Sequence, residues 1–160
     1  MQARELADEL RGESFAAAYT SPLRRALETA EILGRALGLE FTVDDGLEEV
    51  DVGSWSGLTR TEAEARFPGG YARWLEYGHG WDDGETYDAL GDRVVRTLLR
   101  LAAGHAEETV LVVTHGGPIR SALAAADGLS FYDARRSIHG IGNCARFRLV
   151  VRNGRLERVD

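Results

Sequence analysis

The sequence predicts an α/β layered fold, because strand-like segments alternate with segments of helical periodicity. Residues 109–114 (TVLVVT) are apolar on both faces, which is typical of a strand in a parallel sheet that helices cover on both sides. The apolar run over residues 15–20 is followed by apolar positions at helical spacing, namely Leu23, Leu27, Ala30 and Leu37. We therefore expect a three-layer sandwich with a mostly parallel central sheet.

Each element is assigned from its local pattern. Residues 2–10 read as an amphipathic helix, and Ser21 can cap a second helix that Gly38 ends. Asn153-Gly154 is a dipeptide that two-residue hairpin turns prefer. In chain order we expect helix 2–10, strand 15–20, helix 22–37, strand 40–43, loop 46–58, a short helix 61–66 ended by Pro68, loop 77–84, helix 85–103, strand 109–114, helix 118–126 and a hairpin of residues 146–151 and 156–159.

Composition narrows the classes of function. The 160 residues fit a single domain, residues 1–160, and 44% hydrophobic residues allow a buried core. The net charge of −7 argues against a general nucleic-acid binder and against a membrane-surface binder. All 19 basic residues are arginines, which rules out a Schiff-base lysine and a lysine-dependent P-loop. With no signal-peptide pattern, no bilayer-length apolar run and Cys144 as the only cysteine, we expect a cytoplasmic protein without an intrachain disulfide.

A histidine follows the most apolar strand. His115 stands at the carboxyl end of residues 109–114, and Gly116 and Gly117 then lead into a helix. Open α/β sheets bind ligands at the carboxyl ends of their strands, and N–H groups at a helix N-terminus favour an anion. From its position alone, His115 is either a residue of a ligand site or a residue that merely caps the helix.

Two further segments contain charged residues that could contribute to a ligand site. Arg24 and Arg25 lie in the first turn of the expected helix 22–37, where the helix dipole disfavours a cation. A bound anion would explain them, although surface arginines at such positions are common. Glu48 and Glu49 lie in the expected loop 46–58, which can equally be read as a solvated acidic loop.

Together the three segments resemble the motifs of the histidine phosphatase superfamily, which has a phosphoglycerate mutase-like fold. The pattern S-x-L-x-R-A-x-x-T-A is matched around Arg25, L-x-E-x-x-x-G-x-W-x-G around Glu49, and V-T-H-G-G-x-I-R around His115. Residues 84–86 (GET), with Arg93 further on, resemble the family's G-E-S segment. The three motifs occur in the family's order and spacing across nearly the whole chain.

The resemblance implies a role for each matched residue. Arg25 and His115 would hold the phosphoryl oxygens, and Ser21 and Gly116 would complete the phosphate-binding site. Glu49 would protonate the leaving group and later activate water. The implied reaction is hydrolysis of small-molecule phosphomonoesters through a phosphohistidine, without a metal or another cofactor, and inorganic phosphate is an expected ligand.

One part of the family pattern has no counterpart in the sequence. The family opens with a strand that ends in Arg-His-Gly, whose histidine becomes phosphorylated, and no Arg-His-Gly occurs here. The resemblance therefore implies an N-terminally truncated domain that has lost turnover. In the family that strand is central, beside the strands that here end at Thr20 and Thr114. We expect a gap in the sheet, a local rearrangement, or an edge paired with another chain.

Several alternatives stay open at this point. The chain could be a phosphoglycerate mutase or a non-catalytic pseudophosphatase that binds phosphorylated ligands, and a homodimer is not excluded. A serine hydrolase using Ser54 or Ser56 lacks a nucleophile elbow. Aromatic residues between positions 59 and 83 either pack a lid or contact the leaving group: Phe67, Tyr71, Trp74, Tyr77 and Trp81.

Overall fold

A parallel sheet of three strands positions the candidate site. The computed structural model describes residues 1–159, and its first sheet consists of β1 (Ala17–Thr20), β2 (Phe41–Val43) and β3 (Val110–Val113). β1 lies in the middle, since Ala18 pairs in parallel with Phe41 of β2 and with Leu111 of β3. The three expected strands are therefore present, each slightly shorter than predicted.

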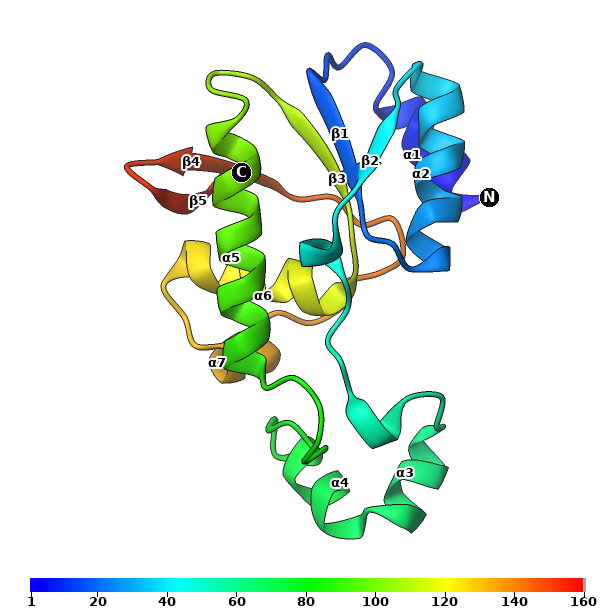
Figure 1. Cartoon of the computed structure of the whole chain (residues 1–160), viewed down its shortest axis with the longest axis vertical. Coiled ribbons are helices and arrows are strands. Elements are labelled where there is room, and N and C mark those ends of the chain that lie inside the picture. Colours follow the sequence, from blue (N-terminus) through cyan, green and yellow to red (C-terminus); the bar gives the residue numbers. More distant parts are fainter. Residues whose placement is uncertain (160) are drawn as a thin grey trace.

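Two helices cover one face of this sheet (Figure 1). α1 (Gln2–Glu9) packs along α2 (Arg24–Leu37), and α2 contacts all three strands. The buried centre of this half consists of Ala7, Leu10 and Leu33, against which Leu111 and Val113 of β3 pack. The prediction that Gly38 ends the second helix is confirmed, because Gly38 adopts the left-handed conformation there, with φ of 70°.

The second half of the chain builds a separate core. α5 (Tyr87–Ala103) packs along α6 (Gly116–Asp127), and α7 (Phe131–Ser137) packs against both helices. The hairpin of β4 (Arg148–Arg152) and β5 (Arg155–Val159) turns at Asn153 and Gly154 as predicted, and both turn residues have positive φ. The buried residues of this core are Trp81, Tyr87, Leu90, Val94, Ala122, Phe131 and Leu156. Helices on both sides of parallel strands give the α/β layers that the sequence predicts.

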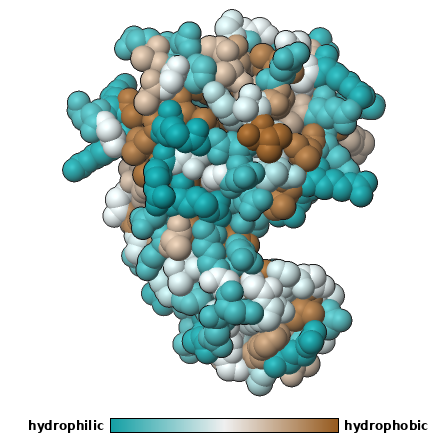
Figure 2. Space-filling model, viewed as in Figure 1, coloured by the Kyte–Doolittle hydropathy of each residue, from teal (hydrophilic) through white to brown (hydrophobic). Residues whose placement is uncertain are grey.

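Two short helices form a lobe beyond the carboxyl ends of the strands (Figure 1). These are α3 (Arg60–Arg66) and α4 (Pro68–Leu75). The prediction of a short helix over residues 61–66 that ends before Pro68 is confirmed by α3. The helix α4 was not predicted; Pro68 is its first residue, where the missing N–H leaves no hydrogen bond unmade. Figure 2 shows a notch in the molecular surface between this lobe and the main body.

β2 and β3 are the two edge strands of this sheet, and β3 is the edge strand that leads to His115. All four residues of β3 are only half-buried, whereas Ala18 and Thr20 of β1 are buried, so the expected full burial of residues 109–114 is not found. Within residues 1–159, β3 pairs with β1 alone, and β4 and β5 form a separate sheet. The expectation that the strand ending at Thr20 would lose a neighbour is wrong, because both edges of β1 are paired. The break in the sheet lies beyond β3 instead.

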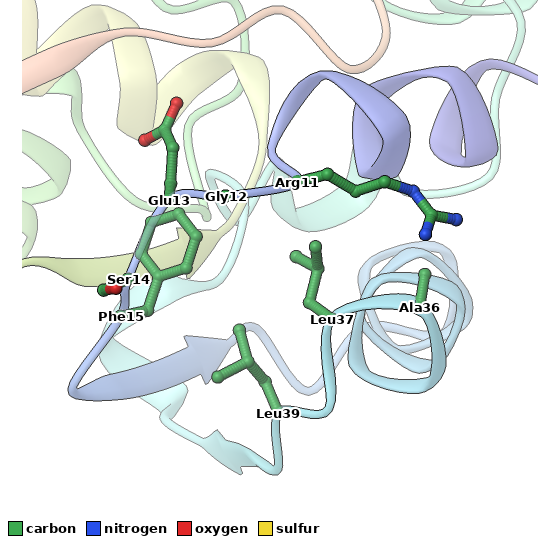
Figure 3. A pocket seen from close by; sticks show the side chains of 8 residues that line it. All are labelled: Arg11, Gly12, Glu13, Ser14, Phe15, Ala36, Leu37 and Leu39. Atoms are coloured by element: carbon green, nitrogen blue, oxygen red, sulfur yellow. The ribbon is translucent and has the colours of Figure 1, made fainter.

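A hollow of about 350 Å³ lies at the amino-terminal end of β1, away from the carboxyl ends of the strands (Figure 3). Its lining includes Phe15, Leu37 and Leu39, and Phe15 precedes β1 in the chain. None of the residues for which the sequence predicts a function lines it. Among the described residues, no helix is both long and apolar enough to span a bilayer.

Candidate active site

The carboxyl ends of β1 and β3 meet at one edge of the sheet. The N–H of Ser21 donates to the carbonyl of Val113 (3.0 Å) and holds the two strand ends together. From the first turn of α2, Nε of Arg25 donates to Nδ1 of His115 (3.0 Å). Arg24 pairs with Glu28 at the surface instead (2.8 Å). The structure thus brings Arg25 and His115 into contact and leaves Arg24 outside the site.

His115 is held as a neutral imidazole. Its side chain is buried, and this burial, followed by the charge of Arg25, lowers the pKa of His115 to about 4. A guanidinium only donates hydrogen bonds, so Nδ1 is an acceptor and the proton of the neutral ring is on Nε2. Nε2 lies 2.7 Å from Oγ of Ser21 and donates to it.

Ser21 supports His115 and is not activated as a nucleophile. It is fully buried, and its Oγ accepts from Nε2 of His115 and from the N–H of Leu23 (3.2 Å). An imidazole that already presents its proton to the hydroxyl cannot act as the base that removes the hydroxyl proton. The expectation that Ser21 caps the second helix is wrong, because Leu23 is the N-cap of α2 and makes no side-chain capping bond.

Glu49 reaches the same edge of the sheet from a loop. Its Oε1 accepts from the N–H groups of Val50 (2.9 Å) and Gly117 (3.1 Å), and its Oε2 lies 3.3 Å from the nitrogen of Gly117. Gly117 is in the first turn of α6, two residues after His115, where the helix dipole favours an anion. A Cβ atom at Gly117 would overlap Oε1 of Glu49, so this contact requires glycine.

A salt bridge between Arg93 and Glu85 fixes the loop on both sides of Glu49. Nε and Nη2 of Arg93 bind the two carboxylate oxygens of Glu85 (2.8 and 2.7 Å), and both side chains are largely buried. Nη1 of Arg93 donates to the carbonyl of Glu48 (3.1 Å), which precedes Glu49. The N–H of Glu85 donates to the carbonyl of Asp51 (2.7 Å), which follows it. The pair is a clamp on the segment that carries the acid.

Thr114, the residue that follows β3, holds the same loop directly. Oγ1 of Thr114 donates to the carbonyl of Leu47 (2.6 Å), and Leu47 is itself buried. The position of Glu49 therefore depends on α5 through the clamp, on α6 through Gly117, and on the end of β3.

The remaining candidates from the sequence lie in different settings. Gly116 is the first residue of α6, so its N–H points out of the helix end. Oγ of Ser54 donates to the carboxylate of Asp83 (3.0 Å), a contact within the loops that leaves it apart from His115. Trp81 is buried and packs with the ring of Trp55 at 5.9 Å, which favours the packing alternative for this residue.

The motif around His115 includes Arg120, but sequence reasoning gave Arg120 no role and did not single out Arg135 or Tyr87. The aromatic ring of Tyr87 lies under the guanidinium of Arg135 (5.3 Å). Arg24 and Arg35 have an acid four residues away that pairs with them, but neither Arg120 nor Arg135 has an acid three or four residues away. A helical arginine without such a partner is the signal that could have found them.

Comparison with known proteins identifies the family. The model of the histidine phosphatase superfamily (branch 1) matches residues 1–159. The chain is 43% identical over 113 residues to bifunctional protein Rv2228c of Mycobacterium tuberculosis, which covers 70% of this chain and 31% of that protein. It is 35% identical over 130 residues to phosphoserine phosphatase 1 of Hydrogenobacter thermophilus, which covers 80% of this chain and 62% of that protein. The chain thus spans less than two thirds of the length of either relative.

A solved structure gives the same result for the fold. YhfR of Bacillus stearothermophilus superposes with a TM-score of 0.90 over 98% of this chain and 78% of that chain, at 27% sequence identity. The match includes the sheet and the helices on both of its sides. The chain belongs to the histidine phosphatase superfamily and has its phosphoglycerate mutase-like fold.

Proposed function

We propose that this chain provides the phosphate-binding and proton-donating parts of a metal-independent phosphomonoesterase that acts through a phosphohistidine. The observation that supports this most strongly is the contact between Arg25 and His115 (3.0 Å) at the edge of the sheet where Glu49 also lies. One relative is named as a phosphatase within the same superfamily. The proposed ligand is a small phosphomonoester or inorganic phosphate.

Arg25 supplies the positive charge for the phosphoryl group. Its Nε is engaged with His115, which leaves Nη1 and Nη2 for two phosphoryl oxygens. An approaching anion favours the protonated form of His115. To take up that proton at Nδ1, the imidazole must give up the hydrogen bond from Nε of Arg25, and both groups then donate to the anion. The N–H of Gly116 is a further donor at the end of α6. Donors arranged in advance stabilise the charge that develops during phosphoryl transfer.

Glu49 is placed to exchange a proton with the leaving group. Two backbone N–H groups fix Oε1, whereas Oε2 has only the longer contact of 3.3 Å. Oε2 is therefore the oxygen that gives a proton to the leaving alkoxide and later takes one from the attacking water. General acid–base catalysis of this kind contributes about 10²–10⁴-fold.

The attacking group must come from outside these 160 residues. No Arg-His-Gly occurs in the sequence, and both ring nitrogens of His115 are engaged. In this proposal, a strand ending in Arg-His-Gly pairs with the free edge of β3 and presents the nucleophilic histidine to the phosphate. The chain alone would bind phosphate without turning substrate over. A non-catalytic binder of phosphorylated ligands is the second candidate function, favoured by the same observation.

Isothermal titration calorimetry with inorganic phosphate tests the proposed site on the chain as it stands. We expect Arg25→Gln to weaken phosphate binding by about tenfold or more, because a charge-assisted hydrogen-bond pair is lost. Arg24→Gln removes the same charge from the neighbouring position and should leave the dissociation constant unchanged. Equal effects of the two substitutions would mean that net charge, and not this site, attracts phosphate.

A further inference from the structure

Two arginines beside the candidate site have no acidic partner. Arg120 in α6 and Arg135 in α7 are half-buried, yet within residues 1–159 no carboxylate oxygen lies within 4.0 Å of either guanidinium. Their hydrogen bonds go only to backbone carbonyl groups, at 3.0 to 3.4 Å. In a chain with 26 acidic residues, neither of these two charges has a salt bridge, and Glu49 acts on Arg120 only at longer range.

The two guanidinium groups are close enough to repel each other, and both act on Tyr87. Nε of Arg120 reaches the carbonyl of Ile138 (3.4 Å), and Ile138 is the C-cap of α7, three residues beyond Arg135. Burial and then the charge of Arg135 lower the pKa of Arg120. Like charges held together in a half-buried place destabilise the free protein, and an anion between them would remove that repulsion.

This arginine pair lies on the side of the site where Glu49 is held. Arg120 follows Gly117 by three residues on α6, so the two share one face of the helix. The N–H of Gly117 is the donor that holds Glu49 (3.1 Å). Because Glu49 is the group proposed to protonate the leaving alkoxide, the arginine pair faces the leaving group rather than the phosphoryl group.

Aromatic rings position Arg135 without neutralising it. Its guanidinium lies 5.4 Å from the ring of Trp74, 5.7 Å from Tyr77 and 5.3 Å from Tyr87. Tyr87 is buried and stacks on Phe131 with a centroid distance of 4.2 Å. The cation is thus held in one place by rings and backbone carbonyl groups, none of which carries a negative charge.

We propose that Arg120 and Arg135 form a subsite for a second anionic group on the leaving group of the phosphomonoester, either a carboxylate or a second phosphoryl group. The subsite rests on the proposed function, because it assumes that the phosphate lies at Arg25 and His115. Both kinds of anion accept hydrogen bonds from a guanidinium fork. The site would therefore select small organic phosphates with a second negative charge over neutral ones of the same size.

Calorimetry on the full chain tests this selection with four probes. These are inorganic phosphate, 2-hydroxyethyl phosphate, phosphoglycolate, and the bisphosphate of ethylene glycol. We expect phosphoglycolate, the bisphosphate or both to bind about tenfold or more tightly than 2-hydroxyethyl phosphate, which has the same length but a neutral end. The tighter of the two anionic probes identifies the second anion.

Variants then separate the subsite from the phosphate site. The measured quantity is the ratio of the affinity for the tighter anionic probe to the affinity for 2-hydroxyethyl phosphate. Arg120→Gln and Arg135→Gln should each bring this affinity ratio close to one and leave the affinity for inorganic phosphate unchanged. Arg135→Lys, which keeps the charge and the contact between helices, should retain part of the preference. Arg136→Gln is the matched control, because Arg136 is the exposed neighbour on α7 and should keep the full ratio.

Two results would overturn the subsite while leaving the proposed function intact. One is that the unmodified chain binds inorganic phosphate through Arg25 but binds the anionic probes no more tightly than 2-hydroxyethyl phosphate. The other is a preference that persists in both Arg120→Gln and Arg135→Gln. Failure of inorganic phosphate to bind through Arg25 would instead contradict the proposed function, and the subsite would fail with it.

Discussion

β1 and β3 both end in the candidate site, but the fold supports them differently. β1 is paired along both edges, and Thr20 and Ser21 at its end are almost fully buried. β3 is paired along one edge and is half-buried throughout, although it leads to His115 and its following residue Thr114 holds the Glu49 loop. The Arg25 side of the site therefore follows a strand that this chain pairs along both edges. The positions of His115 and Glu49 depend on a strand with an open edge.

The largest expected effect is on stability, from a strand supplied to that open edge. An extended chain, with a strand ending in Arg-His-Gly placed before residue 1, should unfold at a clearly higher urea concentration. Buried polar groups left without partners cost about 1–3 kcal/mol each. Because β3 is half-buried, water satisfies part of its open edge, and pairing along β3 should add about 1–3 kcal/mol in total to the free energy of unfolding. Proline substitutions in the added strand should cancel the gain, because proline cannot donate to the ladder. Equal urea midpoints for a monomeric chain with and without the strand would contradict this account of β3.

Gly117→Ala should damage the acid side of the site selectively. A Cβ atom at this position displaces the carboxylate of Glu49, whereas Gly91→Ala in α5 meets open space and serves as control. In the extended chain we expect Gly117→Ala to approach the effect of Glu49→Gln, which is a loss of about 10²–10⁴-fold in kcat for alkyl phosphates. The loss should be smaller for p-nitrophenyl phosphate, whose good leaving group needs little protonation. Equal slowing for both substrates would restrict Glu49 to a positioning role.

Loss of the clamp should have a smaller effect in the same direction. Arg93→Gln frees the carbonyl of Glu48 and breaks the pair with Glu85, so we expect kcat of the extended chain to fall by about tenfold. Because the two residues act together, the double variant with Glu85→Gln should be no worse than either single variant. Arg96→Gln, an exposed arginine on the same helix, is the control. Additive losses would show that the two side chains act independently.

The smallest effect concerns the pH dependence of stability. The pKa of His115 is lowered from 6.5 to about 4 in the folded chain, so the unfolded chain binds an extra proton between these values. The stabilising contribution is complete above pH 6.5 and is lost as the pH falls toward 4. We expect the free energy of unfolding of the unmodified chain to fall more steeply in this window than that of His115→Gln. Parallel curves from urea unfolding at several pH values would mean that the folded state protonates His115 normally.

Much of the fold follows from local patterns in the sequence. The apolar runs give β1 and β3, and the Asn153-Gly154 pair gives the hairpin turn. α4 and α7 could not be predicted in this way. Pro68 is compatible with the end of one helix and the start of another, and α7 is a short helix whose Phe131 packs on Tyr87, a residue distant in the sequence.

The residues of the candidate site could be named from the sequence, but the tertiary contacts that hold them in place could not. Family motifs selected Arg25 over Arg24 and Glu49 over Glu48, and the structure places the selected residues at one edge of the sheet. The sequence predicted a missing neighbour for both β1 and β3, but β1 is paired along both edges and only β3 of these two is not. Strand order depends on pairing across the whole chain, which local patterns do not reveal. The carbonyl of Glu48 is held by Arg93, and such tertiary contacts leave no local pattern.

Hydrolysis of p-nitrophenyl phosphate tests most directly whether this chain holds the phosphate and the acid but not the attacking group. The highly purified chain of 160 residues should show no turnover above background, whereas the extended chain should turn over. Removing the nucleophile from catalytic groups that act as a unit costs on the order of 10⁶ in kcat. Robust hydrolysis by the chain of 160 residues that disappears in His115→Ala would contradict this, because the attacking group would then lie within the chain.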